Sequence, residues 1–166
     1  MTKIAFKGNP VSLSGTEIKV QDKAPEVKLV DGDLNDKTVG GAMGKKQLIV
    51  AVPSVDTPVC AVETRTFNQK VSNLGNVETF IVSMDLPFAS ARFCGAEGIE
   101  RVTPVSDFRN RDFAEKYGLL MADGPLKGLI GRAVFVVDEE GTVVYKELVD
   151  DITHEPDYDK ALSALK

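Results

Sequence analysis

The chain has 166 residues, of which 43% are hydrophobic and 27% are charged. These fractions are close to the average of globular proteins, which excludes an intrinsically disordered chain. A chain of this length buries enough surface to fold without disulfides or a structural metal, so the small disulfide-stabilised scaffolds are excluded as well. Because single domains usually contain about 100 to 200 residues, we expect one domain spanning residues 1–166.

The charge balance limits the possible partners. Lys and Arg together number 20 and Asp and Glu 25, which gives a net charge of −5. A protein that binds nucleic acid needs a basic stripe, whereas here the charges alternate in sign along most of the chain. We therefore expect no nucleic-acid partner.

The apolar segments and the cysteine content predict a location. The longest apolar run, residues 48–53, is far shorter than the roughly 20 residues that cross a bilayer, and residues 1–15 contain no apolar signal core. Only two cysteines are present, which is too few for a disulfide framework and suits a reducing compartment. We expect a cytoplasmic protein with no membrane partner.

The first elements along the chain are strands. Residues 4–6 and 17–20 are predicted to form an N-terminal hairpin, with the turn residues 8–10 between them, and a weak strand follows at 27–30. Residues 47–52 are almost continuously apolar and β-branched. That pattern is typical of a central strand buried on both faces of a parallel sheet.

A helix is predicted directly after this strand. Thr57 is suited to the N-cap position and Pro58 to the first helical position, where its missing N–H costs nothing. Apolar residues then recur at spacings of three and four, as on the buried face of an amphipathic helix that ends near Gly75. This stripe consists of Cys60, Thr64, Phe67, Val71 and Leu74.

Strands and helices alternate in the second half of the chain, before a closing hairpin and helix. The expected elements are a strand at 77–84, a helix at 89–94, a strand at 102–105, a helix at 111–117, a hairpin of strands 133–137 and 142–148, and a helix over 158–165. This order indicates an α/β fold with helices on both faces of one sheet.

Two features of the sequence superficially suggest a ligand site but lack the residues that such a site needs. The glycine-rich segment 40–46 lacks the Ser or Thr that follows the lysine of a phosphate loop, and it precedes its strand instead of following one. The single histidine, His154, lies among acids and a proline with no Cys/His cluster, which predicts a solvated loop residue. We expect neither a bound nucleotide nor a bound metal.

The strongest candidate for chemistry is Cys60. It follows the carboxyl end of the central strand, the edge of an α/β sheet where ligands bind, and it falls in the first turn of the predicted helix. Unpaired N–H groups and the helix dipole favour a thiolate there. The dipole contributes only about 0.3 to 1 kcal/mol, so a nearby cation or charge-assisted hydrogen bonds are also needed. Arg132, just before the strand 133–137, is a candidate whose position the sequence does not fix.

Each of these residues also has an ordinary structural interpretation. Cys60 lies on the apolar helix stripe, and a free cysteine is among the most frequently buried residue types, so an inert packed thiol stays open. The same holds for Cys94, and from the residues alone Arg132 is most simply interpreted as a plain surface arginine.

The segment around Cys60 resembles a known family. Pro53, Thr57 and Cys60 match the Pro-x-x-x-Thr-x-x-Cys motif of the peroxiredoxins, and Arg132 lies where that family keeps its active-site arginine. Residues 83–94 resemble the resolving-cysteine segment of the bacterial thiol peroxidase subgroup. Residues 123–132 are also similar to that subgroup, and the resemblance extends over nearly the whole chain.

The resemblance implies a fold and an activity. The fold is a thioredoxin fold with an N-terminal β-hairpin extension, which agrees with the order of elements above. The activity is thioredoxin-dependent reduction of hydrogen peroxide and organic hydroperoxides, by a homodimer without a bound cofactor.

The resemblance also implies a role for each matched residue. Cys60 is the peroxidatic cysteine, which becomes a sulfenic acid, and Cys94 is the resolving cysteine, which forms an intrachain disulfide with it. Arg132 and the Thr57 hydroxyl hold the peroxide oxygens, and Pro53 shields the sulfur from water. Thioredoxin then reduces the disulfide.

Two other functions remain alternatives. A disulfide oxidoreductase of the same fold usually needs Cys-x-x-Cys, and here position 63 is glutamate. In a redox-inert binding module both cysteines serve only in packing. Peroxide-dependent oxidation of NADPH, coupled through thioredoxin and its reductase, distinguishes a peroxidase from both.

Overall fold

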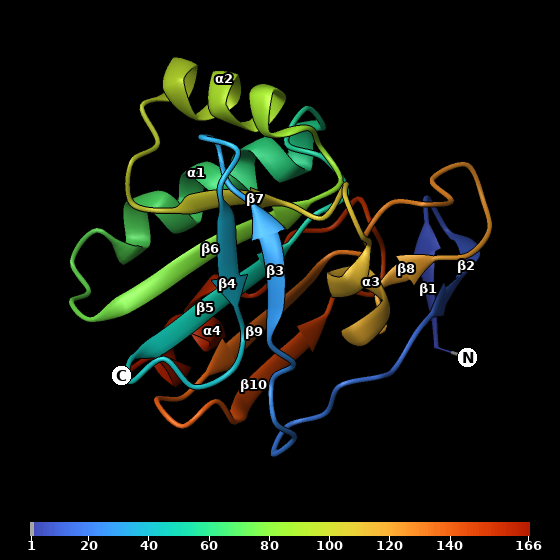
Figure 1. Ribbon diagram of the computed structural model, residues 1–166. Helices are drawn as coiled ribbons and strands as arrows, with labels where there is room; N and C mark the ends of the chain where they lie inside the picture. Colours follow the sequence, from blue (N-terminus) through green and yellow to red (C-terminus); the bar gives the residue numbers. More distant parts are fainter. Residues whose placement is uncertain (1) are drawn as a thin grey trace.

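The computed structural model describes residues 2–166, so only Met1, where the predicted N-terminal stretch begins, lies outside it. The strands form a seven-stranded sheet in the order β10-β9-β5-β6-β7-β3-β4 and a three-stranded sheet in the order β1-β2-β8 (Figure 1). The strands are β1 (Lys3–Phe6), β2 (Asn9–Ser14), β3 (Val27–Val30), β4 (Asp36–Val39), β5 (Lys46–Ala51), β6 (Val77–Ser83), β7 (Thr103–Ser106), β8 (Leu120–Met121), β9 (Ala133–Val137) and β10 (Val143–Leu148). The helices are α1 (Pro58–Val71), α2 (Pro87–Glu97), α3 (Asp112–Lys116) and α4 (Tyr158–Ala164).

Strand β5 lies in the interior of the large sheet, between β9 and β6, and its bounds are close to those that the sequence predicts. It pairs in parallel with β6 but antiparallel with β9, so the sheet is mixed and not the parallel sheet that the apolar run suggested. An apolar strand is buried on both faces in either arrangement, which explains why the pattern did not reveal the direction of the neighbour.

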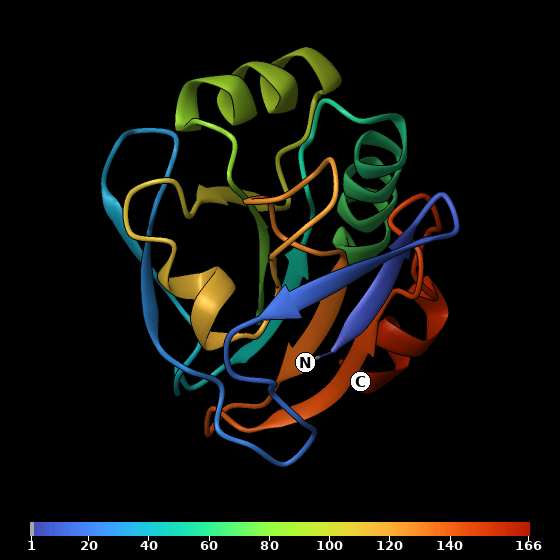
Figure 2. The ribbon, with the colours of Figure 1, turned by 90° about the vertical axis from the view of Figure 1, so that its right-hand side faces the viewer.

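Side chains alternate between the two faces of the sheet and define two cores. Leu48 and Val50 pack with α1 and α4 in one apolar cluster, which also contains both cysteines. Ile49 and Ala51 pack with α3 and the N-terminal hairpin in the other cluster. Figure 2 shows α1 and α4 on one side of the sheet and α3 on the other. The α/β thioredoxin-like architecture is therefore confirmed.

The N-terminal hairpin is present, but its second arm differs from the prediction. Phe6 pairs with Asn9 across a two-residue turn, so β2 replaces the predicted strand at 17–20. Lys7 and Gly8 both have positive φ, 51° and 84°, as a tight hairpin turn requires. Pro10 is tolerated inside β2 because β8 pairs only with its last residues, Leu13 and Ser14, so the other side of β2 is unpaired at Pro10.

The two helices that carry the cysteines begin and end at different residues from those predicted. Helix α1 starts at Pro58 as expected but ends at Val71, before Gly75. Helix α2 is longer than the predicted 89–94 and passes through Gly95 to end at Glu97, with Gly98 as its C-cap at a left-handed φ of 66°. Among residues 2–166, none of the helices is both long and apolar enough to cross a membrane.

Candidate active site

Cys60 lies in the first turn of α1, just beyond the carboxyl end of β5. It is the third residue of the helix, as the sequence predicts, and its side chain is fully buried. The sulfur accepts a hydrogen bond from Arg132 Nη1 at 3.2 Å. A guanidinium at that distance stabilises negative charge on the sulfur. Arg132 is therefore the cation that the sequence analysis required in addition to the helix dipole.

Arg132 is held in place on several sides. Its Nε and Nη2 donate to the carbonyl oxygen of Ile152 at 3.0 and 2.7 Å, and its Nη1 donates to Glu63 Oε2 at 2.6 Å. Only 1% of its surface is exposed, so the interpretation of a plain surface arginine is wrong. Burial acts to lower the pKa of Arg132, but the negative charges of Glu63 and Cys60 outweigh it and raise the pKa above its ordinary value. The guanidinium is a fixed charge in the site.

Glu63 is a site residue that the sequence analysis missed. It is completely buried, and its Oε1 has no hydrogen-bond partner among residues 2–166. Burial raises the pKa of Glu63 to about 7, although the charge of Arg132 acts in the opposite direction. The signal was an acidic residue on the buried stripe of α1, three positions after Cys60, where only a fixed cation makes a carboxylate tolerable.

Thr57 occupies the predicted N-cap position with extended backbone angles. Its hydroxyl does not cap the helix but donates to the carbonyl oxygen of Ser54 at 2.9 Å. The threonine therefore does not stabilise α1 in the way the sequence suggested. The carbonyl of Ser54 fixes the direction of its hydroxyl instead.

A cavity of about 370 Å³ opens beside Arg132. It contains three of the predicted site residues, and most of its lining is apolar. The lining residues are Phe6, Lys7, Pro53, Thr57, Pro58, Val59, Leu126, Arg132, Ile152 and Thr153. Pro53 and Thr57, from the loop between β5 and α1, thus line the same cavity as Arg132, which lies just before β9 and donates to the sulfur of Cys60. Cys60 itself is not among the lining residues.

The N-terminal hairpin forms one wall of this cavity. The carboxylate of Asp151 accepts hydrogen bonds from the N–H groups of Lys7 and Gly8 at 3.3 and 3.0 Å, which fastens the hairpin turn to the loop after β10. The N–H and hydroxyl of Thr153, followed by these two amides, hold the pKa of Asp151 well below its usual range. Asp151 is therefore a charged anchor for the hairpin beside the carbonyl of Ile152 that holds Arg132.

Cys94 lies on the buried face of α2, in the same apolar cluster as Cys60. Both cysteines are free thiols. Burial raises the pKa of Cys94 to about 11, so at neutral pH the thiol is protonated in this conformation. The two cysteines are electrostatically different, because Cys60 has a guanidinium at its sulfur and Cys94 is surrounded by apolar side chains.

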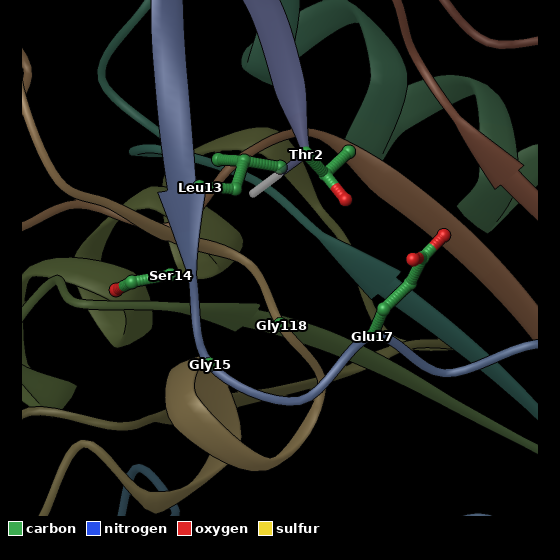
Figure 3. A pocket seen from close by; sticks show the side chains of 6 residues that line it. All are labelled: Thr2, Leu13, Ser14, Gly15, Glu17 and Gly118. Atoms are coloured by element: carbon green, nitrogen blue, oxygen red, sulfur yellow. The ribbon is translucent and has the colours of Figure 1, made fainter.

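A second cavity, of about 600 Å³, shares no residue with the first (Figure 3). It is lined by Thr2, Leu13, Ser14, Gly15, Glu17 and Gly118. Glu17 is the one titratable residue in this lining, and no cysteine or basic residue belongs to it. The guanidinium that contacts the Cys60 sulfur therefore belongs to the first cavity and not to this one.

Comparison with known proteins agrees with this geometry. Residues 19–162 match the Redoxin family. The chain is 52% identical to a thiol peroxidase of Aquifex aeolicus over 163 residues, which covers 98% of this chain and 96% of the relative. It is also 52% identical to a thiol peroxidase of Campylobacter jejuni over 160 residues, covering 96% and 90% of the two chains.

Solved structures agree as well. A peroxiredoxin-like protein from Aquifex aeolicus superposes with a TM-score of 0.97 at 50% identity, over 99% of this chain and 96% of that chain. A thiol peroxidase from Chromobacterium violaceum superposes with a TM-score of 0.88 at 23% identity, over 98% and 94%, which supports the fold. The fold and the cysteine–arginine pair define an oxidoreductase of the peroxiredoxin type. Within that class, the chain belongs to the thiol peroxidase family.

Proposed function

We propose that this chain is a thioredoxin-dependent peroxidase that reduces hydrogen peroxide and organic hydroperoxides in antioxidant defence, with Cys60 as the peroxidatic cysteine. The observation that carries the proposal is the 3.2 Å hydrogen bond from Arg132 Nη1 to Cys60 Sγ. A cysteine that serves only in packing has no need of a buried cation at its sulfur.

In the first step, the Cys60 thiolate attacks the terminal oxygen of a hydroperoxide. An S–O bond forms and the O–O bond breaks, so the sulfur is oxidised to a sulfenic acid that keeps the terminal O–H. The departing alkoxide, or hydroxide when the substrate is hydrogen peroxide, takes up from solvent the proton that the thiol released on ionising and leaves as an alcohol or water. Negative charge develops on the departing oxygen. Arg132 is a fixed donor beside this reaction, and a preorganised donor lowers the barrier because it does not have to reorient.

Thr57 and Pro53 complete the proposed peroxide site. The Thr57 hydroxyl, directed by the carbonyl of Ser54, contributes an oxygen that accepts from the peroxide O–H. Pro53 is buried, lines the same cavity as Arg132 and there limits the access of water to the sulfur. The apolar lining of the cavity suits the organic part of a hydroperoxide.

In the second step, Cys94 resolves the sulfenic acid. The Cys94 sulfur attacks the Cys60 sulfur, an S–S bond forms, and the hydroxyl of the sulfenic acid leaves as water with the Cys94 proton. A reduced thioredoxin dithiol then exchanges with this disulfide, supplying two electrons and two protons, and both cysteines return to thiols. One hydroperoxide is reduced for each thioredoxin oxidised.

We further propose that residues 1–166 form one domain and that the protein is a cytoplasmic homodimer. Ile4 and Ile152, from opposite ends of the chain, share one apolar cluster, which supports a single domain. Leu86 and Phe88 are 51% and 65% exposed near the start of α2, which supports an apolar contact with a second copy. Light scattering coupled to gel filtration measures the oligomeric state, and a monomer would contradict the dimer.

The experiment that tests the function is a coupled assay with thioredoxin, thioredoxin reductase and NADPH. We expect NADPH oxidation that depends on both peroxide and the chain, and that Cys60→Ser abolishes. A disulfide oxidoreductase oxidises NADPH with a disulfide substrate and without peroxide, and a binding module does neither. If Cys60→Ser retains more than a few per cent of wild-type turnover, the proposal is wrong.

A further inference from the structure

The carboxylate of Asp85 joins the loop before α1 to the loop before α2. Its Oδ1 accepts a hydrogen bond from the Ser54 hydroxyl at 2.7 Å, and its Oδ2 accepts one from the N–H of Val55 at 2.8 Å. Asp85 lies between β6 and α2, whereas Ser54 and Val55 lie between β5 and α1. This side chain thus connects the segment that leads to Cys60 with the segment that leads to Cys94.

On the Cys60 side, Asp85 acts through Ser54. The Ser54 hydroxyl accepts a hydrogen bond from the N–H of Asp56 at 3.1 Å while it donates to Asp85. The Ser54 carbonyl accepts both the N–H of Thr57 at 3.2 Å and the Thr57 hydroxyl at 2.9 Å. Asp85 therefore fixes the residue that directs the Thr57 hydroxyl, three positions before Cys60.

On the Cys94 side, Asp85 is held by the end of β6. Ser83 donates its hydroxyl to Asp85 Oδ2 at 3.0 Å and accepts the N–H of Asp85 at 3.2 Å. The next residue, Leu86, is the N-cap of α2. Hydrogen bonds to a carboxylate are stronger than those between neutral groups, so this connection resists relative movement of the two loops.

Disulfide formation requires such a movement. Cys60 and Cys94 are unbonded, and the Cys60 sulfur is engaged by Arg132. A disulfide brings the two sulfur atoms to about 2.05 Å, so the sulfur of Cys60 must leave Arg132 and the two helices must shift or partly unwind. The bonds from Asp85 to Ser54 and Val55 oppose this change because they connect the starts of both helices.

We propose that Asp85 is a positioning residue that holds the start of α1 in the conformation in which Cys60 reacts with peroxide, and that it thereby slows disulfide formation with Cys94. The inference rests on the proposed function, since it assumes that Cys60 is oxidised and Cys94 resolves it. It predicts opposite effects on the two steps. Removing the connection slows sulfenic acid formation and speeds the resolution that follows.

The test is a single turnover of the reduced, full-length protein mixed with hydrogen peroxide, quenched in acid and analysed by mass spectrometry. The chain contains no tryptophan, so the masses of the thiol, trapped sulfenic acid and disulfide forms replace a fluorescence signal. The variants are Asp85→Asn, which keeps the shape but loses the charge, and Ser54→Ala, which removes one partner and spares the carboxylate.

A matched control is Asp138→Asn. Asp138 accepts the N–H groups of Glu140 and Thr142 at 3.0 and 2.9 Å in the β9–β10 turn, so it is also a loop carboxylate that binds backbone amides. We expect Asp85→Asn and Ser54→Ala to slow sulfenic acid formation about tenfold or more and to accelerate disulfide formation severalfold. Asp138→Asn should change neither rate by more than about twofold.

The outcomes separate this inference from the proposed function. If the wild-type protein forms no sulfenic acid at Cys60, the proposed function fails. If the wild type completes both steps but the Asp85 and Ser54 variants leave them unchanged, or slow both in proportion to a loss of thermal stability, the role of Asp85 is wrong. Should Asp85→Asn fail to fold, Ser54→Ala alone decides. In that variant the Asp85 carboxylate keeps its hydrogen bonds from the Val55 N–H and the Ser83 hydroxyl, so the protein should still fold.

Discussion

Glu63 and Arg132 are 69 positions apart in the chain and form an ion pair of 2.6 Å that is almost completely buried, with exposed fractions of 0% and 1%. The same Arg132 nitrogen, Nη1, also donates to the sulfur of Cys60. A carboxylate and a sulfur thus share one donor group. Glu63 fixes the direction of the guanidinium, and it also competes with the sulfur for its positive charge.

Replacement of Glu63 by glutamine tests this relationship, with Glu63 as a positioning residue. We expect peroxide reduction to slow by about tenfold, because Arg132 is held less firmly. The thiolate absorbance of Cys60 at neutral pH should not fall, because the competing carboxylate is gone. Removing one partner of a buried ion pair should also destabilise the protein by about 3 kcal/mol in urea unfolding. A fall in thiolate content together with the rate would contradict this division of roles.

Replacement of Arg132 should give a different combination of effects. Arg132→Ala should lower the thiolate absorbance of Cys60 and slow its reaction with peroxide by about a hundredfold or more. Arg132→Lys should fall between alanine and the wild type, because it keeps the charge but loses the planar donor group. Arg65→Lys is the matched control, since Arg65 lies on α1, the helix that carries Cys60, but forms an exposed ion pair with Glu97. An unchanged thiolate content and rate in Arg132→Ala would remove this residue from the site.

The different roles of Cys60 and Cys94 should be visible in the oxidation products of the wild type and of Cys94→Ser. With thioredoxin as the sole reductant, Cys94→Ser should consume about one equivalent of peroxide per chain and stop as a sulfenic acid, or about two equivalents where a second peroxide oxidises it to the sulfinic acid. Oxidised wild-type protein should run as a monomer on a non-reducing denaturing gel, with Cys60 and Cys94 linked in a peptide map. A covalent dimer as the main product would contradict intrachain resolution.

Asp107 should produce a pH dependence of stability away from the sulfur. It accepts the N–H groups of Phe113 and Ala114 at the start of α3 at 3.0 and 2.9 Å, and burial nevertheless raises its pKa to about 6. A carboxyl whose pKa is higher in the folded than in the unfolded state binds its proton more tightly when folded. The free energy of unfolding should therefore fall as the pH rises from about 4 to about 6, and ionisation of Asp107 is complete above that range.

This prediction is measured by urea unfolding of the wild type and of Asp107→Asn at several pH values. The asparagine variant should lose part of the decline between pH 4 and 6, because it has no proton to release. Other titrating groups, including Glu63, contribute a background that is common to both proteins. If the two curves run parallel across this window, burial does not shift the pKa of Asp107 as described.

Patterns that extend over a whole element were predictable from the sequence. The continuous apolar run gave β5 to within one residue, and the Thr57-Pro58 pair gave the start of α1 and hence the place of Cys60 in its first turn. The short strands β4 and β8 were missed, since two to four residues carry too little periodicity, and their pairing partners come from distant parts of the chain. The second arm of the hairpin was misplaced because Asn9 and Pro10, which are typical turn residues, were assigned to the turn, whereas they begin β2 directly after the two-residue turn at Lys7 and Gly8.

What the sequence by itself determined is the local chemistry of the site: a cysteine at a helix start, after a buried strand, in a segment that resembles the peroxiredoxin motif. Local patterns suffice for this because the helix start and the apolar stripe depend on residues a few positions apart. Only the tertiary structure decided that Arg132 reaches the sulfur, that Glu63 is its partner, and that Asp85 connects the two cysteine-bearing segments. These contacts join residues 30 to 72 positions apart, and strand order and packing, which no local pattern encodes, bring them together.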